Sequence, residues 1–582
     1  MFLPRRSWTL GAAAIAFTGL WFALLAHRPL FDPDEGRYAE IPREMLGGLG
    51  WVIPHLNGLV YLEKPPLQYW LTAFIFRCFG EGEFAARLVP GIAGYLSLAM
   101  VYFLARRLWG IDAGIKALCF TAASSLFVLL GHQLTLDMLL SSELLAALSC
   151  FLMAQEAEVA GRRRIWMLGC WAAMALATLT KGLIGVVIPA ATLAAYTLWQ
   201  RDSGVLRQLC LRRGLPLFAA IAAPWFILAA HADPKFLRFF FVREHFQRFL
   251  TPIEHRTEPW WFFAPVLAVG IMPWLPQAAR AFISPFTEPA PRGRFDAARL
   301  LWIWCVFVLI FFSASDAKLI PYILPAVPAL ALLCASSKRG DGRSLRAGAV
   351  LTAACGVGIL AYVSGRWGSS EGRGLLLLIR PMVACTSVLL ILGAVFCAAF
   401  VLQSRPRAAL ASLCASWFLA SATILTAADA AQSLFSAKDA ALALRAQGAA
   451  ADDPAGDAGG DAGGDAGGNA AGIPIFSIQS YEQSLPFYLK RTVILVDYRD
   501  EFDLGLTEDP GRGVPTLPQF RAQWQALNRG FAVMPPRTWD RLKIMGLPMH
   551  EIARVADRVI VGRNGSPAAP AALSARVSAQ AE

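Results

Sequence analysis

The chain has few charged residues for its length. Of its 582 residues, 16% are Asp, Glu, Lys or Arg, 56% are hydrophobic, and the mean hydropathy is +0.49. Soluble proteins carry about 25% charged residues, so this shortage excludes an ordinary soluble protein. The composition predicts a multi-pass α-helical membrane protein.

Motifs of several other protein classes are missing as well. The 11 cysteines include no Cys-x-x-Cys pair, so their spacing predicts neither a disulfide framework nor a zinc site. No basic-aromatic motif of a nucleic-acid-binding module occurs. We therefore attribute the net charge of +12 to membrane topology and expect no nucleic-acid partner.

Long apolar runs are what the sequence has instead. A spanning helix needs roughly 20 mostly apolar residues. Runs of about that length predict about thirteen transmembrane helices, at residues 8–28, 86–106, 113–131, 134–154, 165–180, 182–200, 214–231, 261–280, 299–314, 318–336, 346–365, 379–402 and 408–428. Because the first run is longer than the roughly 7–15 apolar residues of a signal peptide, we expect it to be retained as a span.

Basic residues fall on alternate connections between these runs, beginning with Arg5-Arg6, Arg106-Arg107 and Arg162 to Arg164. The positive-inside rule makes such connections cytoplasmic, which places the N-terminus inside. We then expect the intervening connections to lie on the periplasmic face of a bacterial inner membrane. These include the large first loop at 29–85, and everything after residue 430 is expected on the same face.

The composition changes after the membrane domain, which we assign to residues 1–430. Residues 449–472 repeat Asp, Ala and Gly and predict a flexible linker. Strand-like and helix-like runs then alternate over residues 473–563, which predicts a small C-terminal α/β domain. We expect strands at 473–478, 492–496, 531–534 and 555–561, helices at 481–489, 520–527 and 539–545, and a disordered tail at 564–582.

Ionisable residues cluster on the first loop, directly after the first apolar run. The stretch beginning at Phe31 holds Asp34-Glu35 and Arg37-Tyr38, and a second stretch holds Tyr61, Glu63 and Lys64. Charged residues at the membrane are costly to hold and mark functional sites. The alternatives are that the two acids only favour the dipole of a following helix, and that Glu63-Lys64 is a surface pair.

Further polar residues fall on the connections predicted to lie on the same side: Asp137, Lys181, Arg243, Glu244, His245, Arg248, Lys318 and Tyr322. Carboxylates can act as a general base or stabilise charge, and Lys and Arg can hold phosphate. Taken singly, Asp137 could cap its helix, Lys181 could extend toward the membrane surface, Lys318 could anchor at the interface, and His245 could be structural. Their shared side predicts a site for a lipid-phosphate-linked substrate.

The motif Asp-Glu-Gly-Arg-Tyr-Ala-Glu-Ile-Pro-Arg-Glu-Met at 34–45 resembles the first-loop motif of bacterial membrane glycosyltransferases of the protein-mannosyltransferase-like group, above all the 4-amino-4-deoxy-L-arabinose transferases that modify lipid A. Further resemblances lie at 62–70, 179–182, 244–249 and 318–325. The resemblance covers roughly residues 8–430. The Asp-Ala-Gly-Gly repeats are unlike the family.

This resemblance implies a GT-C fold, a donor sugar carried on undecaprenyl phosphate, and transfer to a lipid A phosphate that gives resistance to cationic peptides such as polymyxin. It implies Asp34 as the leading catalytic carboxylate and Asp137 as its partner. Lys64, Arg248, Lys318 and Tyr322 would hold the donor phosphate. The substrate pocket would comprise Glu35, Arg37, Tyr38, Tyr61, Glu63, Lys181, Arg243 and His245.

No cofactor is expected to be required, and a divalent ion held by Glu63 and His245 stays open. Two other functions stay open as well. One is a glycosyltransferase that uses a different polyprenyl-phosphate sugar with a protein or glycan acceptor. The other is a lipid-phosphate transporter, which is disfavoured because transporters tend to show internal repeats and charges at the membrane midplane.

Overall fold

The computed structural model describes residues 5–201, 203–250, 257–287, 295–337, 341–364, 370–449 and 473–563. The chain divides into two compact units. The helical unit comprises Met1–His27, Leu62–Ile75 and Phe84–Ala430, and the mixed unit comprises Arg28–Tyr61, Phe76–Glu83 and Ala431–Glu582. The predicted linker, apart from Ala449, and the predicted disordered tail lie outside the described residues.

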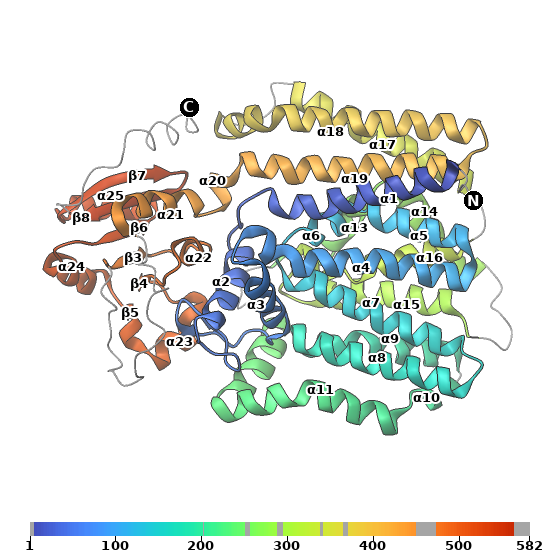
Figure 1. Ribbon diagram of the computed structural model, residues 1–582, viewed down its shortest axis with the longest axis horizontal. Helices are drawn as coiled ribbons and strands as arrows, with labels where there is room; N and C mark the ends of the chain where they lie inside the picture. Colours follow the sequence, from blue (N-terminus) through green and yellow to red (C-terminus); the bar gives the residue numbers. More distant parts are fainter. Residues whose placement is uncertain are drawn as a thin grey trace. The chain divides into compact units, whose positions relative to one another are not determined.

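Long helices of the helical unit lie side by side with roughly parallel axes (Figure 1). Its N-terminal half contains α1 (Arg5–Ala23), η1 (Leu24–Ala26), α4 (Glu83–Trp109), α5 (Ile111–Ala123), α6 (Ser125–Gly131), α7 (Leu136–Gln155), α8 (Ala160–Lys181), α9 (Ile184–Gln200), α10 (Gly204–Arg207) and α11 (Leu211–Ala232). The second half contains η2 (Arg238–Gln247), α12 (Arg248–Leu250), α13 (Phe263–Gly270), α14 (Leu275–Thr287), α15 (Ala297–Ala314), η3 (Ile320–Ile323), α16 (Ala326–Ser336), α17 (Asp341–Ser364), α18 (Ser370–Leu402) and α19 (Pro406–Ala430).

Each of the thirteen predicted spans coincides with a helix or a pair of helices. Among the described residues, 7 helices are long and apolar enough to cross a membrane, or up to 9 if each bent pair is one span. The chain is therefore a multi-span membrane protein, and the count of thirteen stays a prediction. The helices that fall short are α8, whose first turns carry three arginines, and shorter apolar helices at 11–26, 184–200 and 320–336.

Breaks inside three predicted spans have local causes. Between α5 and α6 the axis bends by 66° at Ser124, whose backbone is extended and whose hydroxyl donates to the Phe120 carbonyl. Between α13 and α14 it bends by 117° around Pro273. The run at 318–336 forms only η3 and the 11-residue α16, because Pro321 and Pro325 cannot donate backbone hydrogen bonds within a helix.

The mixed unit combines the first loop with the C-terminal residues. The loop contributes α2 (Asp34–Leu46), a small hairpin of β1 (His55–Leu56) and β2 (Leu59–Val60), and the end of α3 (Leu67–Phe79). The C-terminal part forms a six-stranded sheet in the order β5-β4-β3-β6-β8-β7. Its strands are β3 (Ile475–Ile478), β4 (Ile494–Val496), β5 (Gly513–Val514), β6 (Phe531–Met534), β7 (Met549–Val555) and β8 (Arg558–Arg563).

The sheet is parallel from β5 to β6 and antiparallel from β6 through β8 to β7. Its core contains Phe476, Phe520, Trp524 and Val561. The helical segments of this part are α20 (Gln432–Phe435), α21 (Lys438–Leu444), η4 (Arg445–Ala449), α22 (Leu485–Leu489), η5 (Asp500–Phe502), α23 (Asp503–Glu508), η6 (Pro510–Arg512), α24 (Leu517–Ala526) and α25 (Pro536–Ile544).

The prediction of a single strand at 555–561 is wrong. Ala556, with φ of 52°, and Asp557 form a turn there, and the chain makes a hairpin of β7 and β8. Strand β7 was missed because its sequence, Met-His-Glu-Ile-Ala-Arg-Val, has no apolar run and most of its residues stay partly exposed. The other predicted strands and helices of this domain are present, with ends shifted by a few residues.

Candidate functional site

Four charged side chains of the helical unit form one network. Lys64 Nζ lies 3.0 Å from Glu244 Oε2, and Arg248 Nη1 lies 2.9 Å from the same oxygen. Arg248 also reaches Glu63 at 3.9 Å. Burial alone would raise the pKa of Glu244, but the two cations outweigh it and hold the pKa below its ordinary value. The predicted cluster at 63–64 is thus joined to the predicted cluster at 244–248.

A second ion pair joins α7 to α8. Asp137 lies in the first turn of α7, and its Oδ1 is 2.5 Å from the Nζ of Lys181, the last residue of α8. The same ammonium lies 4.8 Å from the centroid of the Tyr322 ring. The structure therefore brings together three residues that the sequence placed on three separate connections. No hydrogen bond to the other Asp137 carboxylate oxygen is found among the described residues.

Lys318 lies in the connection between α15 and η3. Its Nζ donates to the Ser315 carbonyl at 2.5 Å, and its residue is 7% exposed. Among the described residues, no carboxylate lies within ion-pair distance of this ammonium. A buried cation without a counter-ion is costly, so this position favours an anionic ligand.

The Lys318 connection is attached to the Arg248 segment through the backbone. The Asp316 N–H donates to the Phe249 carbonyl at 3.1 Å, and Ala317 forms an isolated β-bridge with Thr257. Arg248 and Lys318 therefore stand on adjoining segments. Tyr322 lies four residues after Lys318, and its ring contacts the Lys181 ammonium.

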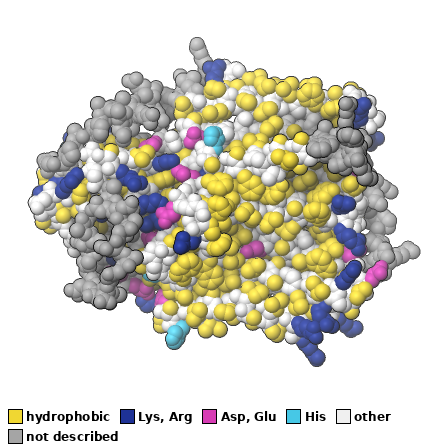
Figure 2. All heavy atoms as spheres, in the orientation of Figure 1, with side chains coloured by type: hydrophobic (Ala, Val, Ile, Leu, Met, Phe, Trp, Pro, Cys, Tyr) yellow, Lys and Arg dark blue, Asp and Glu magenta, His cyan; other side chains and the backbone are white. Residues whose placement is uncertain are grey.

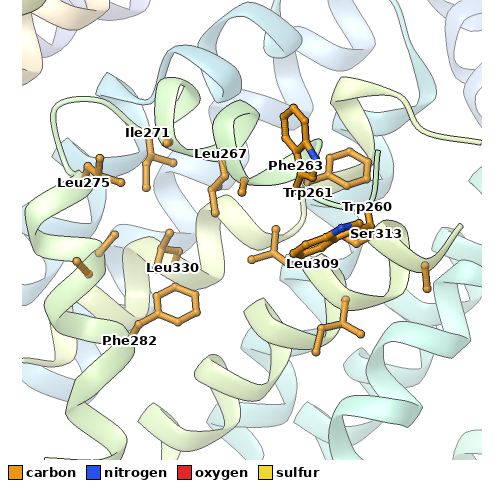
Figure 3. Close-up of a pocket in the computed structure, with 16 residues that line it drawn as sticks. Trp260, Trp261, Phe263, Leu267, Ile271, Leu275, Phe282, Leu309, Ser313 and Leu330 are labelled. Carbon is orange, nitrogen blue, oxygen red and sulfur yellow. The ribbon is translucent and has the colours of Figure 1, made fainter. Parts of the chain in front are cut away.

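An apolar cavity of about 600 Å³ begins beside this connection. Figure 3 shows Trp260, Trp261 and Ser313 at one end of it and Leu275 and Phe282 at the other. Ser313 lies two residues before Ser315, whose carbonyl accepts the hydrogen bond from Lys318. A charged end next to an apolar space suits a ligand that has a phosphate and a long hydrocarbon chain.

The remaining predicted residues of the helical unit are Arg243 and His245, both in η2. The Arg243 guanidinium lies 5.1 Å from the centroid of the Phe239 ring. The side chain of His245 lies outside the described part, so the suggested ion between it and Glu63 stays untested. Among the described residues, no group of three or more His, Cys, Asp and Glu could hold a metal ion.

In the mixed unit, the two acids that open α2 differ in their surroundings. Glu35 is fully buried, pairs with Arg28, and accepts a hydrogen bond from the Phe31 N–H at 2.9 Å. Asp34 is partly exposed, and its carboxylate has no hydrogen bond or ion pair within the described ranges. Glu35 therefore holds the loop in shape, whereas Asp34 makes no such contact within the described ranges.

The other first-loop residues of the predicted pocket lie inside the mixed unit. Arg37 Nη1 donates to the Tyr61 hydroxyl at 3.4 Å, and Nη2 lies 3.6 Å from Glu501. Tyr38 is buried. Arg37 and Tyr61 thus form part of the packing between the first loop and the C-terminal part.

Sequence reasoning missed Asp32, which the structure places at the centre of that packing. Its carboxylate accepts from the Ser484 N–H at 2.5 Å and from the Ser484 hydroxyl at 3.0 Å, and it lies 3.8 Å from Arg558. Burial and the nearby Glu482 raise the pKa of Asp32 to about 7, against the opposing effects of Arg558 and Ser484.

The glycine of the motif has a steric role that its sequence did not show. A Cβ on Gly36 would lie 2.3 Å from the Ser484 nitrogen, so only glycine lets α2 approach this backbone. The partners of Asp32 and Gly36 could not be found from the sequence, because Ser484 and Arg558 lie far along the chain in stretches without a recognisable motif.

Two family models match the chain. One, described as the aminoarabinose transferase C-terminal domain, matches residues 468–563. The other, described as dolichyl-phosphate-mannose-protein mannosyltransferase, matches residues 63–228. They cover the C-terminal domain and the first part of the helical unit.

Curated relatives and solved structures resemble most of the chain. An undecaprenyl phosphate-α-4-amino-4-deoxy-L-arabinose arabinosyl transferase of Pseudomonas paraeruginosa is 34% identical over 436 residues, which cover 71% of this chain and 75% of that protein. The protein of the same name from Erwinia tasmaniensis is 34% identical over 351 residues, covering 59% of this chain and 62% of its own length. The crystal structure of ArnT from Cupriavidus metallidurans bound to undecaprenyl phosphate is 32% identical, with a TM-score of 0.87 over 97% of this chain and 100% of that one.

Proposed function

Since the chain belongs to the family of aminoarabinose transferases, which are membrane glycosyltransferases, we propose that it transfers 4-amino-4-deoxy-L-arabinose from undecaprenyl phosphate to a phosphate of lipid A. The proposal includes the periplasmic face of a bacterial inner membrane as the place of reaction. The consequence for the cell would be resistance to cationic peptides such as polymyxin, because the added amine lowers the negative charge of lipid A.

The observation that carries the proposal is the buried Lys318, which follows the cavity-lining residue Ala314 by four positions in the chain. A phosphodiester would supply the anion that this ammonium lacks among the described residues, and its isoprenoid chain would occupy the cavity shown in Figure 3. Arg248, on the adjoining segment, can add a second charged hydrogen bond to the phosphate. Lys64 and Tyr322 complete the proposed phosphate-binding set.

The reaction we propose is a single displacement at the anomeric carbon. The acceptor oxygen forms a bond to this carbon as the bond from the carbon to the donor phosphate oxygen breaks. Undecaprenyl phosphate leaves with the electron pair, and the configuration inverts. Cations that already face the phosphate stabilise the charge that develops on it.

Asp34 is the proposed catalytic carboxylate. A lipid A phosphate is already ionised at neutral pH, so it needs no strong base, and Asp34 then orients the acceptor or stabilises an oxocarbenium-like sugar. With a hydroxyl acceptor, Asp34 would instead remove the proton. Oδ2 of Asp137, which has no hydrogen bond within the described ranges, is the proposed acceptor of a hydrogen bond from the sugar's ammonium.

The test is the mass of lipid A from a polymyxin-sensitive bacterium that lacks its own transferase, with and without this chain. We expect a gain of one aminopentose per modified phosphate, and no gain with the Asp34→Asn variant expressed to the same level. Unmodified lipid A in cells that contain inserted wild-type protein and the undecaprenyl donor would refute the proposed acceptor or sugar.

A further inference from the structure

A second cavity lies between α7, α8, α9, α11 and α15, away from the residues assigned to the reaction. Its volume is about 270 Å³, and its walls are mostly aliphatic and aromatic, with the Cys170 thiol, two methionines and a single hydroxyl, that of Thr192. This volume is at the low end of cavities that hold small ligands, which suits one hydrocarbon chain rather than a whole lipid. The cavity shares no lining residue with that of Figure 3.

The Thr192 hydroxyl has no hydrogen-bond partner among the described residues, although the residue is only 1% exposed. Several other threonines of the helical unit donate back to their own helix, as Thr178 does to the Met174 carbonyl at 2.9 Å and Thr197 to the Leu193 carbonyl at 2.8 Å. Thr135, like Thr192, has no such partner among the described residues, but it does not line this cavity. Leaving a buried hydroxyl unpaired costs about 1–3 kcal/mol. An acceptor brought by a ligand, such as an ester carbonyl, would remove this cost.

Arginines continue the cavity-lining faces of two helices. On α11, Arg212 precedes the lining residues Leu215 and Phe218 at successive steps of three. On α8, Arg164 precedes the lining residue Met167 by three positions. Residues three apart are neighbours on the surface of a helix, so Arg212 lies next to Leu215, and Arg164 next to Met167, at the edges of the cavity-lining faces.

The connection between α10 and α11 joins the basic cluster to the cavity. Leu209 lines the cavity, and its carbonyl accepts a hydrogen bond from the Trp171 indole at 2.8 Å. A Cβ on Gly214 would lie 2.1 Å from that indole nitrogen, so α11 packs directly on α8 at this level.

The sequence at this end is strongly basic. Residues 156–164 and 201–213 hold seven arginines against three acids. Figure 2 shows Lys and Arg side chains gathered at the corner where Figure 1 places α10.

We propose that this place binds one anionic diacyl phospholipid. The headgroup phosphate would contact Arg164 and Arg212, an ester carbonyl would accept from Thr192, and one acyl chain would fill the cavity. Basic pockets between transmembrane helices are known lipid headgroup sites. Arginines alone would be explained by topology, but a lipid also accounts for the apolar cavity and for the Thr192 hydroxyl, which has no partner in the described part of the chain. The proposal does not depend on the proposed sugar transfer.

Native mass spectrometry of the purified full chain tests the proposal, with phosphatidylglycerol, phosphatidylcholine or undecaprenyl phosphate added in turn. We expect one retained phosphatidylglycerol and weaker retention of phosphatidylcholine. Each arginine near a membrane surface strengthens anionic lipid binding roughly fivefold, so the double variant Arg164→Gln/Arg212→Gln should lose most of the adduct. The control Arg343→Gln/Arg346→Gln removes the same charge from exposed positions of α17 and should keep it.

Two further variants address the cavity itself. Ala190→Phe places a ring at an exposed lining position and should block lipid binding. Thr192→Val removes the hydroxyl while nearly keeping the shape of the side chain, and it should weaken lipid binding. Melting scans of the delipidated variants verify folding. The proposal is overturned by equal retention of the two phospholipids or by equal loss in the control variant. It is also overturned if undecaprenyl phosphate, rather than phosphatidylglycerol, is the lipid whose binding depends on Arg164 and Arg212.

Discussion

The carboxylate of Asp32 accepts hydrogen bonds from both the backbone N–H and the hydroxyl of Ser484, a residue 452 positions later in the chain. Arg558 lies 3.8 Å from the same carboxylate and pairs with Glu482 at 2.6 Å. The start of the first loop is therefore fixed by the C-terminal domain, two residues before the proposed catalytic Asp34.

The stability of the mixed unit should depend on pH through Asp32. The pKa of this carboxyl is about 7 in the folded protein and near 3.8 without the fold. At a pH between these two pKa values, folding therefore takes up a proton. The contribution of Asp32 to the free energy of unfolding is full below pH 3.8, falls as the pH rises toward 7, and does not change further above pH 7. The slope is roughly 1 kcal/mol per pH unit at most.

Hydrogen exchange of residues 473–563, corrected for intrinsic rates, should show protection falling from pH 5 to pH 7, and the slope should shrink in Asp32→Asn. Burial and Glu40 also raise the pKa of Glu44, which adds a slope of the same sign. Glu44→Gln is therefore measured alongside. An identical slope in wild type and Asp32→Asn would show that Asp32 does not titrate in this range.

Gly36→Ala should loosen the first loop. The added Cβ would meet the Ser484 backbone at 2.3 Å, which cannot move aside as a flexible side chain could. Overpacking of this kind costs about 1–3 kcal/mol. Gly82→Ala is the matched control, because no atom lies within 4 Å of its new Cβ. Equal melting temperatures of the two variants would contradict the close approach.

Asp34 and Glu35 should fail in different ways when each is made neutral. Asp34→Asn should retain the wild-type melting temperature and lose turnover, because its carboxylate supports no contact in the described structure. Glu35→Gln should melt earlier, since removing one partner of a buried pair costs about 3–5 kcal/mol. Turnover of purified protein and a melting scan separate the two. Stable, active Asp34→Asn would remove Asp34 from the mechanism.

Lys318→Met should weaken donor binding without destabilising the protein. The substitution removes a buried cation that has no carboxylate partner among the described residues, so the melting temperature should stay level or rise. A charged hydrogen bond contributes about 1.5–3 kcal/mol, so affinity for undecaprenyl phosphate should fall roughly 10- to 100-fold. Binding is measured by the ligand-induced shift in melting temperature. A marked loss of stability with unchanged affinity would assign Lys318 to the fold alone.

Much of the helical unit could be predicted from the sequence. Apolar runs locate its helices because a spanning segment must satisfy its backbone internally, and the breaks follow from prolines such as Pro273 and Pro321. The grouping of Asp137, Lys181 and Tyr322 was also predictable to the extent that one side of the membrane brings connections together. Their contact distances were not.

Several features of the mixed unit could not be predicted from the sequence. Strand β7 lacks an apolar run, so nothing separated it from a loop. Asp32 lies two residues before the predicted Asp34-Glu35 pair. Its contacts are with Ser484 and Arg558, and no local sequence pattern connects these residues to it. Likewise, the contrast between Glu35 and Asp34 comes from Arg28, and two adjacent acids look equivalent until their neighbours are known.

The long separation between Asp32 and Ser484 also sets an order of assembly. During synthesis at about 5–20 residues per second, the first loop waits roughly 20 to 90 seconds before Ser484 is made. Until then, α2 lacks the backbone against which Gly36 packs, and Asp32 lacks its hydrogen bonds. A chain truncated after α19 would keep the pair of Glu35 with Arg28 but leave α2 without its contacts to Ser484. Completion of the polypeptide thus acts as the step that finishes the loop carrying Asp34.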